Sequence, residues 1–384
     1  YSVGVYDCNI LGWKKHTASI ILDSYRPKII IIWVYGHHPS ASTQTMPIAE
    51  QIAKDIKAIN SNILIAMGGI HTSALPERTL KEEAIDYVIQ GDGLHSIINL
   101  LNDLRFEIKN KKAVYSSDYN ENLLDKYFKN YAWDLIPDLS NYRAHNFHCF
   151  QYFKDSKKED FSDVRSPYAA IYTSLGCPYN CFYCCANSLY KKGSVRDWEL
   201  ETVLKWIDEL VLKHKVKNIR IHDNLFTHDT AKLESFANQI EERKYNLNLS
   251  VYARIDTLNE KTLFAMARAG VKWIGIGIES VRNIKNRKAI ETIKMIQSCG
   301  MYTCANYMFG LPNDTLQTMQ ETLNLALELN TEFANFYSCM AFPGSPLYNK
   351  IAMEESSRLP LTWEGYSQHG YETYPLSNNN LLAK

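Results

Sequence analysis

The feature that most constrains the fold is an alternation of apolar, strand-like runs with amphipathic, helix-like runs. In a first series, strands are expected at residues 2–7, 28–35, 62–69 and 86–92, with helical segments between them. Strands that are separated by helices join parallel sheets, because a crossover connection must return the chain to the same edge. Residues 1–105 therefore predict an α/β domain of the flavodoxin or Rossmann-like type.

A second series follows further along the chain. Strands are expected at residues 168–176, 217–223, 249–256, 273–280, 303–310 and 332–340, and helices at segments such as 199–214 and 315–329. Six strand–helix units favour a partial (β/α)6 barrel over residues 166–352. Residues 106–165 lose the alternation and are predicted to form a connector, and residues 353–384 a C-terminal cap or tail.

Composition excludes several classes of function. Lys plus Arg and Asp plus Glu both total 42, and no basic run marks a nucleic-acid groove. No stretch approaches the roughly 20 apolar residues that a membrane helix needs. From the balanced charge and the lack of a long apolar run, we expect that the protein binds neither nucleic acid nor membrane. The sequence opens without a charged segment followed by an apolar one, so we expect a cytoplasmic protein. In that reducing compartment, nine cysteines favour metal binding or catalysis over disulfides.

Three of the cysteines form a CxxxCxxC motif directly after the first expected barrel strand. Cys177, Cys181 and Cys184 lie in a loop that also contains glycine, proline and asparagine. A structural zinc site takes four ligands, and the chain has no second CxxC or HxxxH pair. Three thiolates suit a [4Fe–4S] cluster with one iron left open. Cys185, next to the motif, is interpreted as a small buried residue.

The spacing, with an aromatic residue just before the last cysteine (CFYC), resembles the radical S-adenosylmethionine (SAM) enzymes. The resemblance implies that the open iron chelates the amino and carboxyl groups of SAM. It also implies cleavage of SAM to methionine and a 5′-deoxyadenosyl radical, with Tyr183 in contact with the adenine. We find no nucleophile triad, which suits chemistry carried by cofactors.

The same resemblance assigns SAM contacts to the ends of the other strands. It implies Asp223 for the amino group, Arg254 for the methionyl carboxylate, Glu279 for the ribose or methionine end, and Asn306 with Gly310 for the adenosine. Structural alternatives stay open. Thr227 or His228 beside Asp223 would cap a helix, Arg254 would form a surface salt bridge, and the turn at Gly310 would serve any strand-to-helix junction.

The stretch DCNILG at residues 7–12 resembles the DxHxxG motif of cobalamin-binding domains. Asp7 and Gly12 match the motif, but Asn9 replaces its cobalt-ligating histidine. Asn is a poor cobalt ligand, so the resemblance implies cobalamin without a protein imidazole. Ser40, Gly68 and Gly69 follow later strands and are predicted to contact the cobalamin. The alternative is a domain that retains the fold but no cofactor, with His37, His38 and His71 as ordinary loop residues.

The domain order resembles the class B, cobalamin-dependent radical SAM methyltransferases. That implies methyl transfer to an unactivated carbon of a small-molecule substrate, with one SAM methylating cobalamin and a second giving the radical. It also implies an electron donor such as flavodoxin or ferredoxin. A non-methylating cyclisation or rearrangement, and a non-catalytic cobalamin and Fe–S sensor, are the alternatives. The aromatic and polar residues Asn335, Tyr337, Trp363, Tyr366, His369 and Tyr371 are predicted to line a substrate pocket or to pack in the core.

Overall fold

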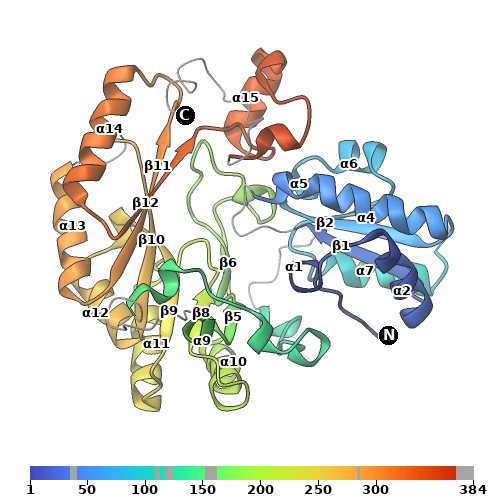
Figure 1. Cartoon of the computed structure of the whole chain (residues 1–384), viewed down its shortest axis with the longest axis horizontal. Helices are drawn as coiled ribbons and strands as arrows, with labels where there is room; N and C mark the ends of the chain where they lie inside the picture. Colours follow the sequence, from blue (N-terminus) through green and yellow to red (C-terminus); the bar gives the residue numbers. More distant parts are fainter. Residues whose placement is uncertain (35–40, 109–112, 117–123, 152–161, 283–285, 369–384) are drawn as a thin grey trace. The chain divides into compact units, whose positions relative to one another are not determined.

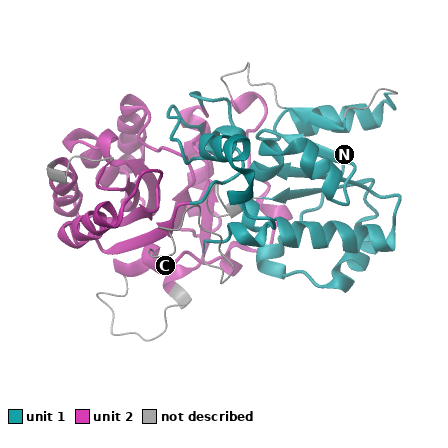
Figure 2. Ribbon diagram, turned by 90° about the horizontal axis from the view of Figure 1, so that it is seen from above, with its two compact units in different colours: residues 1–122, 176–195, 340–376 teal, residues 123–175, 196–339, 377–384 magenta. Residues whose placement is uncertain are grey.

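The protein divides into two compact units (Figure 2). The structure, a computed structural model, describes residues 1–34, 41–108, 113–116, 124–151, 162–282 and 286–368. Unit 1 comprises residues 1–122, 176–195 and 340–376, and unit 2 comprises residues 123–175, 196–339 and 377–384. The loop with the cysteine motif thus groups with the N-terminal domain, whereas the second half of the expected connector groups with the barrel.

Unit 1 is built around a parallel four-stranded sheet in the order β1-β2-β3-β4 (Figure 1). Its strands are β1 (Ile29–Val34), β2 (Leu64–Gly69), β3 (Tyr87–Gln90) and β4 (Val114–Ser116). Its N-terminal helices are α1 (Cys8–Leu11), α2 (Lys15–Tyr25), α3 (Ala41–Gln44), α4 (Met46–Ile59), α5 (Ile70–Ala74), α6 (Pro76–Glu82) and α7 (Ser96–Arg105). Alternate side chains of β1 enter two hydrophobic cores on opposite faces of the sheet. Ile30 and Ile32 pack in the core that includes α2 and α4, and Ile29 and Ile31 pack in the core that includes α7. Both faces of the sheet are therefore buried, as the predicted α/β class requires.

The expected first strand at residues 2–7 is wrong. Residues 1–5 are exposed and have no strand geometry, and β1 instead pairs directly with β2 over six residues. Gly4 lies against the ring of Tyr25, and the Tyr1 hydroxyl donates to Leu101 O at 2.7 Å. The segment therefore packs its side chains outside the sheet. It does not pair its backbone with a strand, although its apolar alternation predicts that pairing.

The C-terminal part of unit 1 contains α15 (Pro346–Glu354) and the 3-10 turns η7 (Ser356–Arg358) and η8 (Glu364–Tyr366). The Trp363 ring packs edge-on against His71, with 4.4 Å between centroids, and the Arg78 guanidinium lies 4.2 Å from the same ring. Tyr366 is 1% exposed. The described part of the tail therefore uses Trp363 and Tyr366 for core packing, one of the two roles left open for them.

Unit 2 contains the predicted partial barrel, a parallel six-stranded sheet in the order β12-β11-β10-β9-β8-β5. Its strands are β5 (Tyr168–Ile171), β8 (Asn218–Ile221), β9 (Asn248–Arg254), β10 (Val271–Glu279), β11 (Tyr302–Phe309) and β12 (Phe333–Ser338). The helices α10 (Leu200–Leu212), α11 (Thr230–Arg243), α12 (Glu260–Arg268), α13 (Asn286–Ser298) and α14 (Leu316–Leu329) cover the outer face (Figure 1). The carboxyl ends of all six strands thus meet at one edge, where such folds place their sites.

The opposite end of the barrel is held by a buried polar network. The connector turn η4 (Phe147–Cys149) places His148 against β9, where its Nε2 lies 2.8 Å from Asn248 O. Asn248 Nδ2 donates to His148 O at 2.7 Å and to Asn218 Oδ1 at 2.8 Å. Gln151 bridges Asn248 and the Trp273 indole at 2.9 and 3.0 Å. The network satisfies polar groups at the starts of β8, β9 and β10, which would otherwise be buried without partners.

Two further elements flank the cysteine motif. Strand β6 (Ser174–Gly176) enters the loop and β7 (Val195–Asp197) leaves it, and the two pair as a short sheet. Within the part of the chain that the structure describes, no helix combines the length and the apolarity that crossing a membrane requires.

Candidate functional site

The cysteine motif occupies an ordered loop that is closed at its base by β6 and β7. Gly176 adopts φ +103°, and a side chain there would collide with Ser194 O, so only glycine fits this turn. Asn187 Nδ2 donates to Tyr179 O at 3.1 Å and to Asn180 Oδ1 at 3.2 Å. These bonds join the two halves of the loop.

The motif's three thiols differ from their neighbour in exposure. Cys177, Cys181 and Cys184 are half-buried and in no disulfide, and Tyr183 is half-buried too, whereas Cys185 is 3% exposed. Burial raises the pKa of Cys185 well above its usual value, and the nearby Cys184 adds to the effect. Cys185 therefore stays a thiol, in keeping with its predicted role as a small core residue.

The donor set suits the predicted cluster, because three cysteines that form no disulfide lie within eight residues of one loop. Among the described residues, no three His, Cys, Asp or Glu side chains are already gathered as a metal site. The thiols would therefore draw together when the cluster binds. Their assignment as ligands stays a prediction.

Asp223 follows β8 at the carboxyl edge of the barrel and is fully buried. Its Oδ1 accepts hydrogen bonds from Thr173 N at 2.6 Å and Ser174 N at 3.1 Å, and its Oδ2 accepts from the Thr173 and Ser174 hydroxyls at 2.5 and 2.8 Å. Burial raises its pKa, and these four bonds oppose that shift. The carboxylate thus serves the chain just before the cysteine loop, and its predicted bond to SAM stays untested.

The helix after β8 is capped by a residue that was not predicted as its N-cap. Asp229 is the N-cap of α11, and its Oδ1 accepts from Ala231 N and Lys232 N at 2.9 and 3.0 Å. The alternative of a cap at Thr227 or His228 is therefore wrong. His228 instead lies against Asp197, with 3.1 Å between Nε2 and Oδ1.

Arg254 and Glu279 stand at the ends of β9 and β10. Arg254 forms a two-point ion pair with Asp256, at 3.0 Å from Nε to Oδ1 and 2.7 Å from Nη2 to Oδ2. Its hydrogen bonds lower the pKa of Asp256. Glu279 has φ +64°, a left-handed conformation that is costly for a residue with a side chain and occurs often at functional sites. Arg254 thus already makes the salt bridge given as its alternative role.

Asn306 lies inside the end of β11. Its Nδ2 donates to Ile276 O at 3.3 Å, and its Oδ1 accepts from Asn335 Nδ2 at 3.0 Å. Gly310 follows the strand with φ +77° and begins the turn to α14. Tyr337, on neighbouring β12, is half-buried, and burial raises its pKa to about 12. Asn335 and Tyr337 are thus placed near Asn306 by strand register.

A buried arginine in β8 was not predicted from the sequence. Arg220, in the middle of β8, is 5% exposed and donates to the Tyr252 hydroxyl. Its guanidinium carbon lies 4.9 Å from the centre of the Tyr252 ring. A charged residue within the apolar run NIRI was the available signal, because buried arginine occurs only where partners surround it.

The predicted cobalamin motif at residues 7–12 is a short capped helix. Asp7 is the N-cap of α1, and its carboxylate accepts from Asn9 N at 2.9 Å. Gly12 ends the helix with φ +69°. Asn9 itself is exposed. The caps of this helix therefore account for the residue types at Asp7 and Gly12. Contact of Asp7, Asn9 and Gly12 with cobalamin stays a prediction.

Glycines and a buried histidine mark the carboxyl edge of the unit 1 sheet. Side chains at Gly68 and Gly69 would collide with the Trp33 ring and with Val34 O, so the protein's own packing requires both glycines. His71 follows them and is 1% exposed, and burial lowers its pKa to about 3. Its Nδ1 lies 3.2 Å from Thr43 Oγ1, and among the residues that the structure describes its buried Nε2 finds no hydrogen-bond partner. An orphaned polar atom here suits a bound ligand.

Some predicted residues lie outside the described part of the chain. They are Ser40 with His37 and His38 after β1, and His369 with Tyr371 in the tail.

Comparison with known families identifies both domains. A B12 binding domain matches residues 1–101, and the Radical SAM superfamily matches residues 171–326. The chain belongs to the enzymes that join a cobalamin-binding domain to a radical SAM domain. Its cofactors are accordingly cobalamin, SAM and a [4Fe–4S] cluster.

Individual relatives carry the comparison further. An uncharacterized methyltransferase of Pyrococcus horikoshii is 26% identical over 360 residues, which are 90% of this chain and 74% of that protein. The anaerobic magnesium-protoporphyrin IX monomethyl ester cyclase of Rubrivivax gelatinosus is 24% identical over 81% of this chain, but the chain spans only 57% of the cyclase. The radical SAM methyltransferase TsrM of Kitasatospora setae shares the fold, with a TM-score of 0.68 at 16% identity over 92% of this chain and 70% of TsrM.

Proposed function

We propose that the protein transfers a methyl group to an unactivated carbon of a small-molecule substrate. The observation that carries this proposal is the presence of both family domains on one chain. The relative from Pyrococcus horikoshii, which is named a methyltransferase and matches 90% of the chain, supports it. None of the nine cysteines, all of which the structure describes, forms a disulfide, which suits a reducing compartment, and we place the protein in the cytoplasm.

The protein's own contribution is to bind and orient the cofactors. When bound, the cluster supplies one electron to SAM, and cobalamin carries the methyl group. Cys177, Cys181 and Cys184 would hold the cluster, leaving one iron for SAM. Arg254, already aligned by Asp256, presents a planar guanidinium suited to the methionyl carboxylate.

The remaining SAM contacts are proposed for Tyr183, Asp223, Glu279, Asn306 and Gly310. The strained backbone at Glu279 and the amide pair of Asn306 with Asn335 support two of them, because preorganised polar groups favour binding. Asp223 is the weakest of the five, since four donors already occupy its carboxylate.

The cobalamin contacts are proposed for Asp7, Asn9, Gly12, Ser40, Gly68 and Gly69. His71 is added to them, because its buried Nε2 has no hydrogen-bond partner within the described part of the chain. Exposed Asn9 supplies no imidazole, so we expect a cobalt without a histidine ligand from this motif.

The electron for the cluster must come from a protein such as flavodoxin or ferredoxin, and we propose a docking place for it. Within unit 1, the cysteine loop and α15 border a depression of about 450 Å³. Its lining includes Lys192 and Lys350, together with Asn180, Asn187 and Asn349. Two lysines and a set of amide groups at the loop that carries the ligands suit an acidic donor.

A cyclisation is the second candidate function, because the cyclase from Rubrivivax gelatinosus matches 81% of the chain. Anaerobic reconstitution with iron, sulfide and hydroxocobalamin, followed by incubation with methyl-labelled SAM and candidate substrates, separates the two. Methyl transfer gives a labelled product that is heavier by one CH2 group, and cyclisation gives an unlabelled one. Failure of the protein to bind cobalamin would refute methyl transfer. Failure to cleave SAM would favour the non-catalytic sensor.

A further inference from the structure

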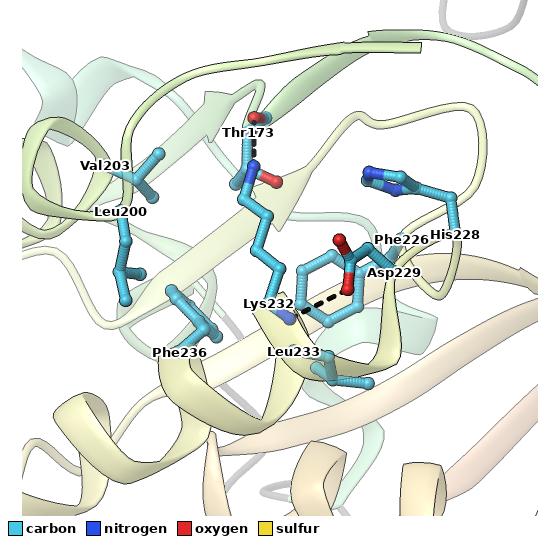
Figure 3. A pocket seen from close by; sticks show the side chains of 9 residues that line it. All are labelled: Thr173, Leu200, Val203, Phe226, His228, Asp229, Lys232, Leu233 and Phe236. Atoms are coloured by element: carbon cyan, nitrogen blue, oxygen red, sulfur yellow. Dashed lines mark hydrogen bonds between the residues drawn. The ribbon is translucent and has the colours of Figure 1, made fainter. Parts of the chain in front are cut away.

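Four charged side chains of unit 2 surround the two ends of the cysteine loop. They are Asp197 on β7, Asp223 after β8, His228 before α11 and Lys232 on α11, and we call them the loop clamp. Figure 3 shows Lys232 reaching from α11 to Thr173, with His228 nearby. The predicted SAM contacts do not include Asp197, His228 and Lys232.

The entry to the loop is held by Asp223. Its four hydrogen bonds all come from Thr173 and Ser174, which precede the first motif cysteine by four and three residues. Two of the donors are backbone N–H groups, so the carboxylate fixes the main chain as well as the side chains. Hydrogen bonds to a charged group are roughly twice as strong as neutral ones.

The exit from the loop is held by Asp197. Its Oδ1 accepts from Lys232 Nζ at 2.5 Å and lies 3.1 Å from His228 Nε2. Lys232 Nζ also donates to Thr173 O at 3.2 Å. One ammonium group therefore connects the chain entering the loop to the chain leaving it.

His228 is the second side chain that contacts Asp197. Its Nδ1 lies 3.0 Å from Leu225 O and its Nε2 3.1 Å from the Asp197 carboxylate, so both nitrogens face groups that only accept hydrogen bonds. The ring satisfies both only when both nitrogens carry protons. Burial alone would lower the pKa of His228, but its hydrogen bond and charge interaction with Asp197 raise it. His228 and Lys232 thus both face the Asp197 carboxylate.

Apolar packing keeps the bridging lysine in place. The Lys232 side chain runs along a cavity of about 20 Å³ that is lined mainly by aliphatic and aromatic side chains (Figure 3). Leu200, Val203, Phe226, Leu233 and Phe236 form that lining. An ammonium group surrounded by such side chains is confined to the positions where acceptors satisfy it. These are Asp197 and Thr173 O.

We infer that the loop clamp positions the cysteine loop by joining its two ends, so that the loop in which the three thiols draw together around the cluster begins and ends at fixed places. Asp223 and Lys232 are positioning residues, acting through Thr173, Ser174 and Asp197. The inference deepens the proposed function and rests on it for the identity of the cluster. The hydrogen bonds of the clamp form between residues of the protein itself and need no bound cofactor.

Hydrogen exchange on the full chain without cofactors tests the clamp directly. In Lys232→Met, which retains an apolar side chain in the cavity, peptides covering residues 172–197 should exchange about tenfold faster, as expected for loss of one charged hydrogen bond. Lys232→Arg should restore slow exchange. Lys205→Met removes an exposed ion pair with Glu201 on α10 and is the control. Unchanged exchange in a folded Lys232→Met protein would overturn the inference.

Asp223 gives a second, independent test. Asp223→Ala should accelerate exchange in the same peptides, and Asp223→Asn, which retains a carbonyl acceptor for the two backbone N–H groups, should do so less. If the alanine variant fails to fold, the asparagine variant and Lys232→Met still decide. Equal exchange in Asp223→Asn, Lys232→Met and the native protein refutes the clamp.

Reconstitution links the clamp to the cluster. Lys232→Met should hold severalfold less iron per chain than the native protein and give a broadened electron paramagnetic resonance signal after reduction, with recovery in Lys232→Arg. Native iron content and line shape in a folded Lys232→Met protein would contradict the positioning role. If the native protein itself binds no cluster, the proposed function fails, and the exchange measurements still test the clamp.

Discussion

Acid should destabilise the barrel through His148 in particular. This ring is 2% exposed and held at the amino end of the strands by Asn248. Burial lowers its pKa from 6.5 to about 3, and the hydrogen bond to Asn248 only partly opposes this effect. His148 therefore stays neutral in the folded protein at a pH where the same ring in the unfolded chain takes up a proton.

The sign and size of the effect follow from that difference. Because the unfolded state binds the extra proton, the free energy of unfolding falls as pH drops below 6.5, and this contribution levels off near pH 3. Between pH 7.5 and pH 5.0 the loss from this one group is about 2 kcal/mol. Above pH 6.5 the contribution is fully present, so His148 should leave stability there unchanged.

Chemical denaturation followed by tryptophan fluorescence measures this difference. His148→Gln retains an N–H donor within reach of Asn248 O but takes up no proton, so its unfolding free energy should fall by about 2 kcal/mol less over the same pH range. The control His16→Gln, at an exposed position on α2, should behave like the native protein. Parallel pH dependences for His148→Gln and the native protein would show that this ring is not a source of acid sensitivity.

Three further predictions concern the cofactors. Cys181→Ala should abolish binding of the cluster, whereas Cys185→Ala should retain its iron and its Fe–S charge-transfer absorption. Loss of iron in both variants would contradict the assignment of Cys185 to the core. Asn9→His should supply an imidazole to reconstituted cob(II)alamin and add a nitrogen splitting to its paramagnetic resonance spectrum, and an unaltered spectrum would place residue 9 away from cobalt. Reversal of the charge at both Lys192 and Lys350 should slow reduction of the cluster by an acidic electron donor and should weaken the salt dependence of that rate. If the variant and the native protein are reduced at equal rates at low salt, this depression is not the docking place.

Patterns that are local in the chain predicted much of this protein. The period of apolar residues was sufficient for the six barrel strands and for the class of the N-terminal domain, because each strand buries side chains that its own sequence supplies. The CxxxCxxC spacing likewise identified the radical SAM domain, which the family comparison confirms. The expected strand at residues 2–7 failed because a short apolar alternation does not decide between pairing and packing against a neighbour such as Tyr25.

Contacts between distant residues needed the tertiary structure. Asp223 lies 50 positions from Thr173, and Lys232 lies 35 from Asp197, yet these pairs are joined at 2.5–2.6 Å because parallel strands return to the same edge of the barrel. No periodicity encodes which carboxylate meets which donor across such separations. The sequence by itself therefore determined the two α/β domains through the period of its apolar residues, and the cofactors through the resemblance of its motifs to known families. Only the tertiary structure decided that Asp223 and Lys232 hold the two ends of the cysteine loop, because burial and partner choice are properties of the packed chain.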